Sequence, residues 1–326
     1  MRLVRTMKRI TSLLSLFLFA ICTNVLAQSY PSRPVRIVVP FPAGGPSDVL
    51  VRAMAQRMTE GWGQPVIVEN KPGANTIIGA ESVAKSAPDG YTLLTVIDST
   101  LTMNPSLYSR LPYDPIKDFA PITAFGFGGI YLMADAAKGP TSIQELIQFA
   151  RTNPGKLNLG GGTIISQLAF EVFKRRLGLD IGYVPYKGSA GTSQGLLTGD
   201  VPVTIDGLTS YIPYIKAGRV RPIGTFTARP LPGITGVPTV AEAATLPGLD
   251  MGVWVGLVAP AGTPPAVINR IHDETARALA LADVKERFAT NGFEAATNSP
   301  SEFAKMIREQ IEYFRPIIKD VGLKLD

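Results

Sequence analysis

Short apolar segments alternate with helical patterns along most of this chain, and Gly- and Pro-rich turns separate them. The apolar segments have the length and β-branched content of buried strands, as in the run VRIVVPF at 35–41. Regular alternation of strand and helix favours an α/β fold with mainly parallel sheets flanked by helices. The expected strands are 35–41, 66–69, 91–97, 157–159, 183–184, 201–205, 220–226 and 251–258.

Capping signals mark where several of the expected helices begin. Ser142 with Glu145, and Ser299 with Glu302, have the spacing of a capping box. Thr263 before Pro264 is also favoured at a helix start, because Thr suits the N-cap and Pro the first helical position. The expected helices cover 49–58, 75–85, 142–152, 163–177, 192–197, 211–216, 264–291 and 300–318. The length of 326 residues favours two domains.

The first 27 residues have the pattern of a secretory signal peptide. Four basic residues precede a short apolar run at 10–22, and Val25 and Ala27 are small residues at −3 and −1 of a cleavage site. The apolar run is too short to predict a transmembrane helix. Cleavage after Ala27 would lower the formal net charge from +6 to +2, which removes the main support for a nucleic-acid partner. We therefore expect an exported, periplasmic protein.

The chain contains one His and one Cys. Zinc sites with several His ligands, Cys-rich metal clusters and a disulfide within the chain are therefore excluded. We expect no metal ion and no cofactor.

Two glycine-rich loops each follow an apolar strand and precede a helix: residues 41–48 and 160–167. Glycines let a ligand approach the backbone closely, and the free amides and dipole of a helix start favour an anion. A carboxylate can be held there without an arginine. The alternative is that both are ordinary strand–helix turns in which Ser47 and Thr163 act as N-caps. Neither loop has a nucleotide-binding pattern.

A second motif would place the chain among hydrolases. Residues 191–195 read Gly-Thr-Ser-Gln-Gly, and Ser193, Asp250 and His272 follow the chain order of an α/β-hydrolase triad. The residues 185–189 separate Ser193 from the strand that such a nucleophile requires, and His272 lies on an amphipathic helix. This secreted serine hydrolase remains the alternative function.

Asp206 ends an expected strand, where parallel sheets commonly bind ligands, although a simple turn residue is nearly as good an interpretation. Asp48 is expected either to cap a helix or to contact ligand or water. Trp254 is expected in the core.

Several separated blocks resemble the Bug-type periplasmic solute-binding proteins of tripartite tricarboxylate transporters, and together they cover the mature chain. They are YPSRP at 30–34, the loop at 38–48, GQPV at 63–66, VENKPGA at 68–74, APDGYTL at 87–93, NPSLY at 104–108, LPYD at 111–114, VPYKGSA at 184–190, PTVAEA at 238–243 and LVAPAGTP at 257–264.

The resemblance implies a two-domain "Venus flytrap" with a ligand cleft between domain 1 (28–128 and 251–326) and domain 2 (129–250). It implies a small organic acid ligand, from dicarboxylates and amino acids to aromatic carboxylates, whose carboxylate is held by backbone amides and water. Carried over by position, the ligand-binding residues are Phe41, Gly44, Gly45, Ser47, Asp48, Ser99, Thr100, Gly161, Gly162, Thr163, Gln167 and Asp206. Gln167 replaces the His that is frequent in the family, and Asp98-Ser99-Thr100 departs from its usual Gly/Ser-rich middle loop.

The resemblance also implies how such a protein works. It would capture the carboxylate between its lobes, as a monomer, and deliver it to membrane permease subunits. An alternative output is sensory, with the closed form presented to a membrane histidine kinase.

Overall fold

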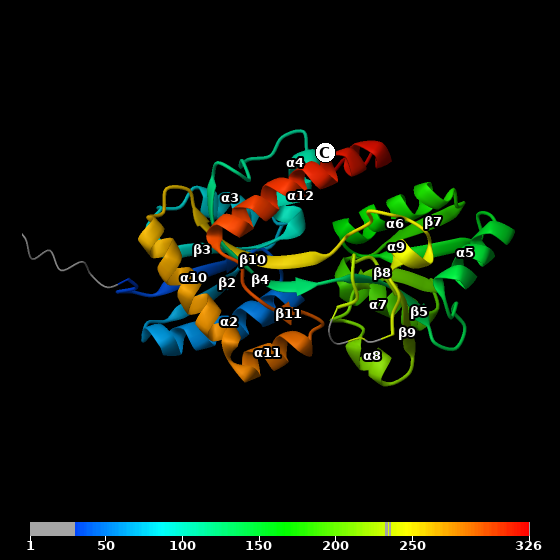
Figure 1. Cartoon of the computed structure of the whole chain (residues 1–326), viewed down its shortest axis with the longest axis horizontal. Helices are drawn as coiled ribbons and strands as arrows, with labels where there is room; N and C mark the ends of the chain where they lie inside the picture. The colour runs from blue at the N-terminus through cyan, green and yellow to red at the C-terminus, as the bar shows by residue number, and fades with distance from the viewer. Residues whose placement is uncertain (1–29, 232–233, 235, 326) are drawn as a thin grey trace, which may run out of the picture.

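Two β-sheets with helices on their faces form the framework of the computed structural model, which describes residues 30–231, 234 and 236–325 (Figure 1). The expected signal peptide lies outside the described residues. The first sheet has the order β11-β4-β10-β3-β1-β2 and the second β7-β6-β8-β5-β9. We call each sheet with its helices a lobe. The strands of the first lobe are β1 (Val35–Val39), β2 (Val66–Asn70), β3 (Thr92–Ile97), β4 (Phe119–Gly128), β10 (Val253–Pro260) and β11 (Glu294–Ala295). Those of the second are β5 (Ile130–Asp135), β6 (Leu157–Gly161), β7 (Ile181–Pro185), β8 (Val203–Gly207) and β9 (Val220–Thr225).

The α/β fold with two lobes is confirmed, but the expectation of mainly parallel sheets is wrong. In the described part of the chain, parallel pairing joins β1 to β2 and β3, and β6 to β7 and β8. The remaining pairs are antiparallel and all involve β4, β5 or β10. The chain passes from one lobe to the other through these strands. They are therefore antiparallel to the neighbouring strands that are joined to one another through helices within a lobe.

Helices cover both faces of each sheet, because alternate residues of a strand point to opposite faces. In the first lobe, α2 (Pro46–Trp62) and α10 (Pro265–Ala280) cover the face of Ile37 and Leu257. The helices α3 (Ile77–Ala84) and α12 (Pro300–Val321) cover the opposite face, which carries Val38 and Leu94. Successive strand residues therefore serve two cores, as period-2 alternation requires.

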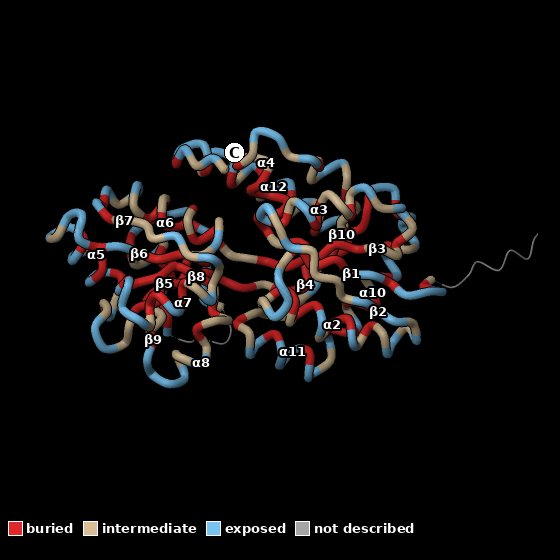
Figure 2. The backbone as a smooth tube through the Cα atoms, turned by 180° about the vertical axis from the view of Figure 1, so that it is seen from behind, coloured by how far each residue is buried: buried red, intermediate tan, exposed pale blue. Residues whose placement is uncertain are grey.

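The second lobe is built in the same way. The helices α5 (Ile143–Thr152) and α6 (Ile164–Leu177) pack over Leu159 and Ile205, and α7 (Gly188–Thr198) packs over Tyr131 and Met133. Figure 2 colours each residue by its burial, and many buried residues lie in the strands of both lobes. The shorter helices are α4 (Asn104–Leu107), α8 (Ile212–Lys216), α9 (Val240–Ala243) and α11 (Ala282–Ala289).

Two segments connect the lobes, and we call them the crossing segments. The first is Gly128–Ile130, between β4 and β5, and the second is Met251–Val253, which leads into β10. The long helix expected up to Gly292 is instead divided into α10 and α11, because Leu281 adopts an extended conformation between them. No helix within the described ranges is long and apolar enough to cross a membrane.

Candidate functional site

The three predicted loops leave their sheets at edges that adjoin the crossing segments. Ile97, the last residue of β3, lies opposite Val255 near the start of β10. In the second sheet Gly207, the last residue of β8, lies opposite Ile130, the first of β5. Because β1 runs parallel to β3 and β6 parallel to β8, the loops after β1 and β6 leave at these same two edges. The C-terminal ends of β1 and β3 in the first lobe, and of β6 and β8 in the second, therefore lie next to the crossing segments. In sheets of this kind, ligands commonly bind at such strand ends.

The first loop, Phe41–Asp48, is organised by the carboxylate of Asp48. This buried group accepts hydrogen bonds from the Gly44 amide at 2.9 Å, from Arg52 Nε at 3.0 Å and from Asn70 Nδ2 at 2.8 Å. Gly44 has a φ of 81°, a conformation that favours glycine. Burial by itself disfavours the charged form, but the bonds from Arg52, Gly44 and Asn70 outweigh it and hold the pKa of Asp48 below its usual value.

Among the described residues, the start of α2 leaves two backbone amides without a hydrogen-bond acceptor in the helix. Its N-cap is Gly45, which has no side chain that could accept a hydrogen bond from the first turn, and Pro46 has no N–H. The amide of Val49 donates to the Gly45 carbonyl at 3.0 Å, so Ser47 and Asp48 are left without an acceptor inside the helix. The interpretation of Ser47 as an N-cap is therefore wrong.

The middle loop forms the π-helical segment η1 (Ser99–Met103). Thr100 is fixed from two sides: Thr76 Oγ1 donates to its hydroxyl at 2.9 Å, and Tyr113 Oη donates to its carbonyl at 2.6 Å. Asp98 precedes η1 and is 1% exposed; its Oδ1 accepts from the Ser99 amide at 2.7 Å. Its Oδ2 is buried with no hydrogen-bond partner among the described residues. Burial raises the pKa of Asp98 to about 7, although the bond from Ser99 opposes the rise.

The second loop, Gly160–Gln167, joins β6 to α6. Thr163 is the N-cap of α6, and its Oγ1 accepts from the Ser166 amide at 3.2 Å, so this part of the N-cap interpretation is confirmed. A Cβ at Gly162 would lie 2.5 Å from the Gly188 carbonyl and from Thr192 Oγ1. A glycine is required here because the loop lies against the start of α7. Gln167 is half-buried in the first turn of α6.

Asp206, near the end of β8, contacts the start of α7. Its Oδ1 accepts from Ser189 Oγ and from the Gly207 amide, both at 2.7 Å, and its Oδ2 is a further buried oxygen without a partner among the described residues. The side chain is 1% exposed. Burial raises the pKa of Asp206 to about 6, against the hydrogen bonds from Ser189, Gly207 and Thr192. Burial and the Asp206 charge both raise the pKa of Tyr183.

The structure thus gathers the predicted residues into two groups, one in each lobe. Within the described residues, no hydrogen bond joins a predicted residue of one lobe to one of the other. A contact between the lobes does lie at the same edge, where Thr209 Oγ1 donates to the Asn291 carbonyl at 2.7 Å.

Sequence reasoning missed three neighbours of these loops: Arg52, Tyr183 and Ser189. Ser189 had a usable signal, since Gly188-Ser189 opens a helix directly after β7, the pattern of the other two loops. Arg52 could have been found from its spacing, four residues after Asp48 on one helix face.

The hydrolase alternative does not fit the geometry. Residues 191–195 lie inside α7 instead of at a strand–helix turn, and Ser193 donates its hydroxyl to the Ala190 carbonyl at 3.0 Å. His272 lies on α10 of the other lobe, where its Nδ1 contacts Asp273 at 3.2 Å. The nucleophile and base of a triad therefore come from different lobes.

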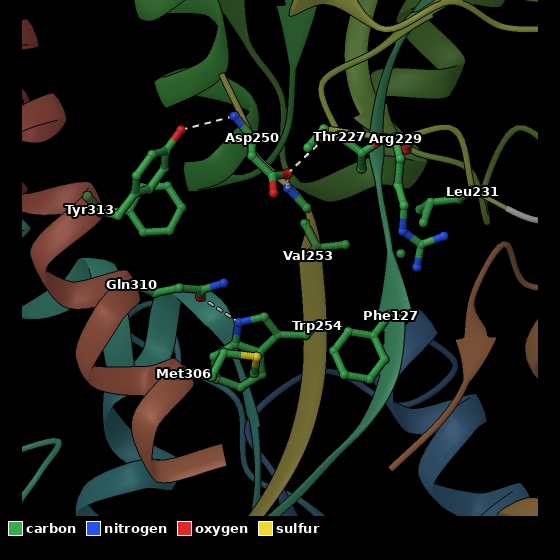
Figure 3. A pocket seen from close by; sticks show the side chains of 14 residues that line it. Phe127, Thr227, Arg229, Leu231, Asp250, Val253, Trp254, Met306, Gln310 and Tyr313 are labelled. Carbon is green, nitrogen blue, oxygen red and sulfur yellow. Dashed lines mark hydrogen bonds between the residues drawn. The ribbon is translucent and has the colours of Figure 1, made fainter. Parts of the chain in front are cut away.

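A cavity of about 400 Å³ lies at the crossing segments, between α12 and residues 227–231 (Figure 3). Phe127, Val253 and Trp254 form its floor, and Arg229 and Asp250 lie at its rim. None of the predicted ligand residues lines this crossing pocket. Trp254 is 2% exposed, which confirms its expected place in the core. The described residues hold no group of three or more His, Cys, Asp or Glu side chains that could bind a metal ion.

A family model and several known proteins match this chain over most of its length. A family model described as "Tripartite tricarboxylate transporter family receptor" matches residues 50–323. The chain is 37% identical over 300 residues to the UPF0065 protein in the tcbD-tcbE intergenic region of Pseudomonas sp., covering 91% of this chain and 88% of the relative. It is 32% identical over 324 residues to Protein BugT of Bordetella pertussis, covering 98% of this chain and 99% of the relative.

Solved structures resemble the fold over nearly its full length. The structure of Rpa4515 of R. palustris with adipate has a TM-score of 0.82 and 32% identity, covering 90% of this chain and 99% of that one. The structure of MatC of Rhodopseudomonas palustris with bound malate has a TM-score of 0.78 and 30% identity, covering 89% of this chain and 100% of that one.

Proposed function

Because this chain belongs to the tripartite tricarboxylate transporter receptor family, we propose that it captures a small carboxylate between its two lobes and delivers it to the permease of such a transporter. The protein would be exported to the periplasm after cleavage behind Ala27 and would act as a monomeric binding protein without catalysis. The bound adipate and malate of two similar structures support the choice of a carboxylate.

The observation that carries this proposal is the uncapped start of α2. The Ser47 and Asp48 amides have no acceptor in the helix, and the macrodipole of this 17-residue helix adds positive potential at the same point. Asp48 is already paired with Arg52, so its charge is offset. An incoming carboxylate could accept hydrogen bonds from these amides.

The second lobe would close on the same ligand with the loop before α6. Thr163 caps the Ser166 amide of α6, and the amides of Ile164 and Ile165 have no acceptor inside the helix. We propose that the ligand contacts Phe41, Gly44, Gly45, Ser47, Asp48, Ser99 and Thr100 in one lobe and Gly161, Gly162, Thr163, Gln167 and Asp206 in the other. The lobes would correspond to 28–128 with 251–326, and to 129–250, since the crossing segments fall at these boundaries.

A thermal-shift screen with malate, adipate, succinate and benzoate tests the proposal. A ligand at 100 times its Kd stabilises the folded protein by about 2.7 kcal/mol. We expect at least one carboxylate to raise the Tm, and isothermal titration calorimetry should then give its Kd. No stabilisation by any of them at millimolar concentration would contradict carboxylate capture.

A matched pair of variants tests the first loop. Both α2 and α12 begin with Pro-Ser, at Pro46-Ser47 and Pro300-Ser301. We expect Ser47→Leu to weaken carboxylate binding at least tenfold, because the larger side chain covers the free amides. Ser301→Leu should leave the Kd unchanged. Equal affinities of the two variants would remove the α2 start from the site.

A further inference from the structure

The first half of α12 belongs to the first lobe. Phe303, Ile307 and Ile311 pack in one core cluster with Leu94 and Trp254. The rings of Trp254 and Phe303 meet edge-on, with centroids 5.2 Å apart. Trp254 Nε1 also donates to Gln310 Oε1 at 2.6 Å, as Figure 3 shows. These contacts hold α12 on the sheet of the first lobe.

The second half of α12 is anchored in the second lobe. Phe314, Ile318 and Val321 belong to the core cluster that contains Phe170 and Phe173 of α6. Arg175 of α6 donates from Nη1 to the Asp320 carbonyl at 2.7 Å and from Nη2 to the Val321 carbonyl at 2.9 Å. A cationic side chain therefore satisfies two carbonyls at the C-terminal end of α12, where the macrodipole is negative.

Tyr313, between these halves, binds the chain just before the second crossing segment. Its hydroxyl accepts from the Asp250 amide at 3.0 Å and donates to the Gly248 carbonyl at 3.1 Å. Figure 3 shows Tyr313 reaching across the crossing pocket toward Asp250. A rotation of the lobes that moved residues 248–250 relative to α12 would break these two hydrogen bonds.

The middle ligand loop rests on the same helix. Leu101 of η1 packs in the cluster of Ile307 and Ile311, whereas Met103 packs in the cluster of Phe314 and Ile318. The segment η1 therefore packs against α12 and has residues in the core clusters of both halves of that helix. Ser99 and Thr100, proposed above to contact the ligand, are its first two residues.

We infer that α12 is a third connection between the lobes, and that Tyr313 and Arg175 are positioning residues that couple the η1 loop to the second lobe. The coupling to ligand rests on the proposed function, whereas the mechanical link between the lobes does not. A ligand that draws η1 toward itself shifts the surface on which α12 rests, and α12 transmits that shift to α6 and to residues 248–250. Conversely, the contacts of Tyr313 and Arg175 set the lobe arrangement that the ligand meets.

Fluorescence energy transfer between the lobes tests the link without any ligand. Cys22 is the only cysteine in the sequence, so a chain beginning at Gln28 can be labelled through Lys285→Cys on α11 and Arg151→Cys on α5, both exposed positions. We expect Tyr313→Phe with Arg175→Met to shift or broaden the transfer-efficiency distribution. Controls are Tyr214→Phe on α8 and Arg219→Met, whose guanidinium lies over the Tyr214 ring within the second lobe. A distribution identical to that of the unsubstituted protein would overturn the inference.

Calorimetry with malate and adipate then tests the coupling. We expect the same double variant to change the Kd about fivefold or more, a size typical of coupling between distinct sites. The Kd rises if the contacts hold the ligand-bound arrangement and falls if they oppose it, and either result supports coupling. An unchanged Kd with an intact fold would overturn it. If neither acid binds the unsubstituted protein, the proposed function fails while the energy-transfer result still decides the role of α12.

Discussion

Replacing Asp98 by Asn should remove a loss of stability that the protein otherwise suffers as pH rises. Burial raises the pKa of Asp98 from 3.8 to about 7, so the folded protein holds this proton more tightly than the unfolded chain does. The contribution of the Asp98 carboxyl to the free energy of unfolding is therefore fully present below about pH 4 and is lost as pH rises toward 7. At about 1.4 kcal/mol for each pKa unit, this loss amounts to about 4 kcal/mol.

The substitution leaves the local bonding almost intact. Asn retains the Oδ1 that accepts from the Ser99 amide, and its amide takes the place of the protonated oxygen. Because Asn cannot ionise, its contribution does not change with pH. Asp206 remains in both proteins, so its own pH dependence cancels in the comparison.

Urea unfolding followed by circular dichroism at pH 4.5, 6, 7.5 and 8.5 measures the effect. We expect the free energy of unfolding of the unsubstituted protein to fall relative to Asp98→Asn by about 3 kcal/mol across this range, because about 1 kcal/mol of the total is already lost at pH 4.5. Asp320→Asn, the same chemical change at an exposed position, should run parallel to the unsubstituted protein. If the Asp98→Asn profile is also parallel, Asp98 is not a buried carboxyl that resists ionisation.

Three further outcomes follow from the loops. Asp48→Asn should cost about 2 kcal/mol at pH 7, as is typical of a charged hydrogen bond; since the pKa of Asp48 is lowered, urea titrations should show the full difference above about pH 4 and its loss only as pH falls through that lowered pKa. Gly162→Ala forces a Cβ against Gly188 and Thr192, so calorimetry should show carboxylate binding weakened tenfold or more, with about 1–3 kcal/mol of stability lost. Ser193→Ala should match the unsubstituted protein in an esterase assay, with neither above background, and turnover lost only in the variant would restore the hydrolase.

Sequence patterns located most strands and helices because β-branched runs and capping residues act locally. The pattern at Ser299 and Glu302 does form a capping box. The strands β4 and β5 were not predicted. Their sequence is one apolar stretch interrupted by glycines, and nothing local indicates that Gly128 and Gly129 separate two lobes. Strand direction in β10 also depends on how the lobes connect, so its antiparallel pairing could not follow from strand–helix alternation.

The candidate site was predicted as a set of strand–loop–helix turns, which is local information, and the turns at 41–48 and 160–167 have that form. What each side chain does depends on tertiary neighbours. The sequence allows either a capping or a ligand role for Asp48, whereas in the structure its carboxylate accepts hydrogen bonds from the Gly44 amide and from Arg52. Asp206 bonds Ser189, which lies 17 residues away in the sequence and on a different element.

The carboxyls beside the proposed site differ in how their charge is controlled, and the difference suits an anionic ligand. Asp48 stays ionised because Arg52 and the Gly44 amide stabilise its charge, so it can order the first loop without adding net negative charge. Asp98 and Asp206 have no ion-pair partner among the described residues, and burial favours their neutral forms instead. A carboxylate entering between the loops would therefore meet backbone amides before any uncompensated negative charge. As pH rises through about 6 to 7 and these two groups ionise, their charges would repel the ligand in a region of low dielectric, so affinity should decline over the pH interval in which folding stability also falls.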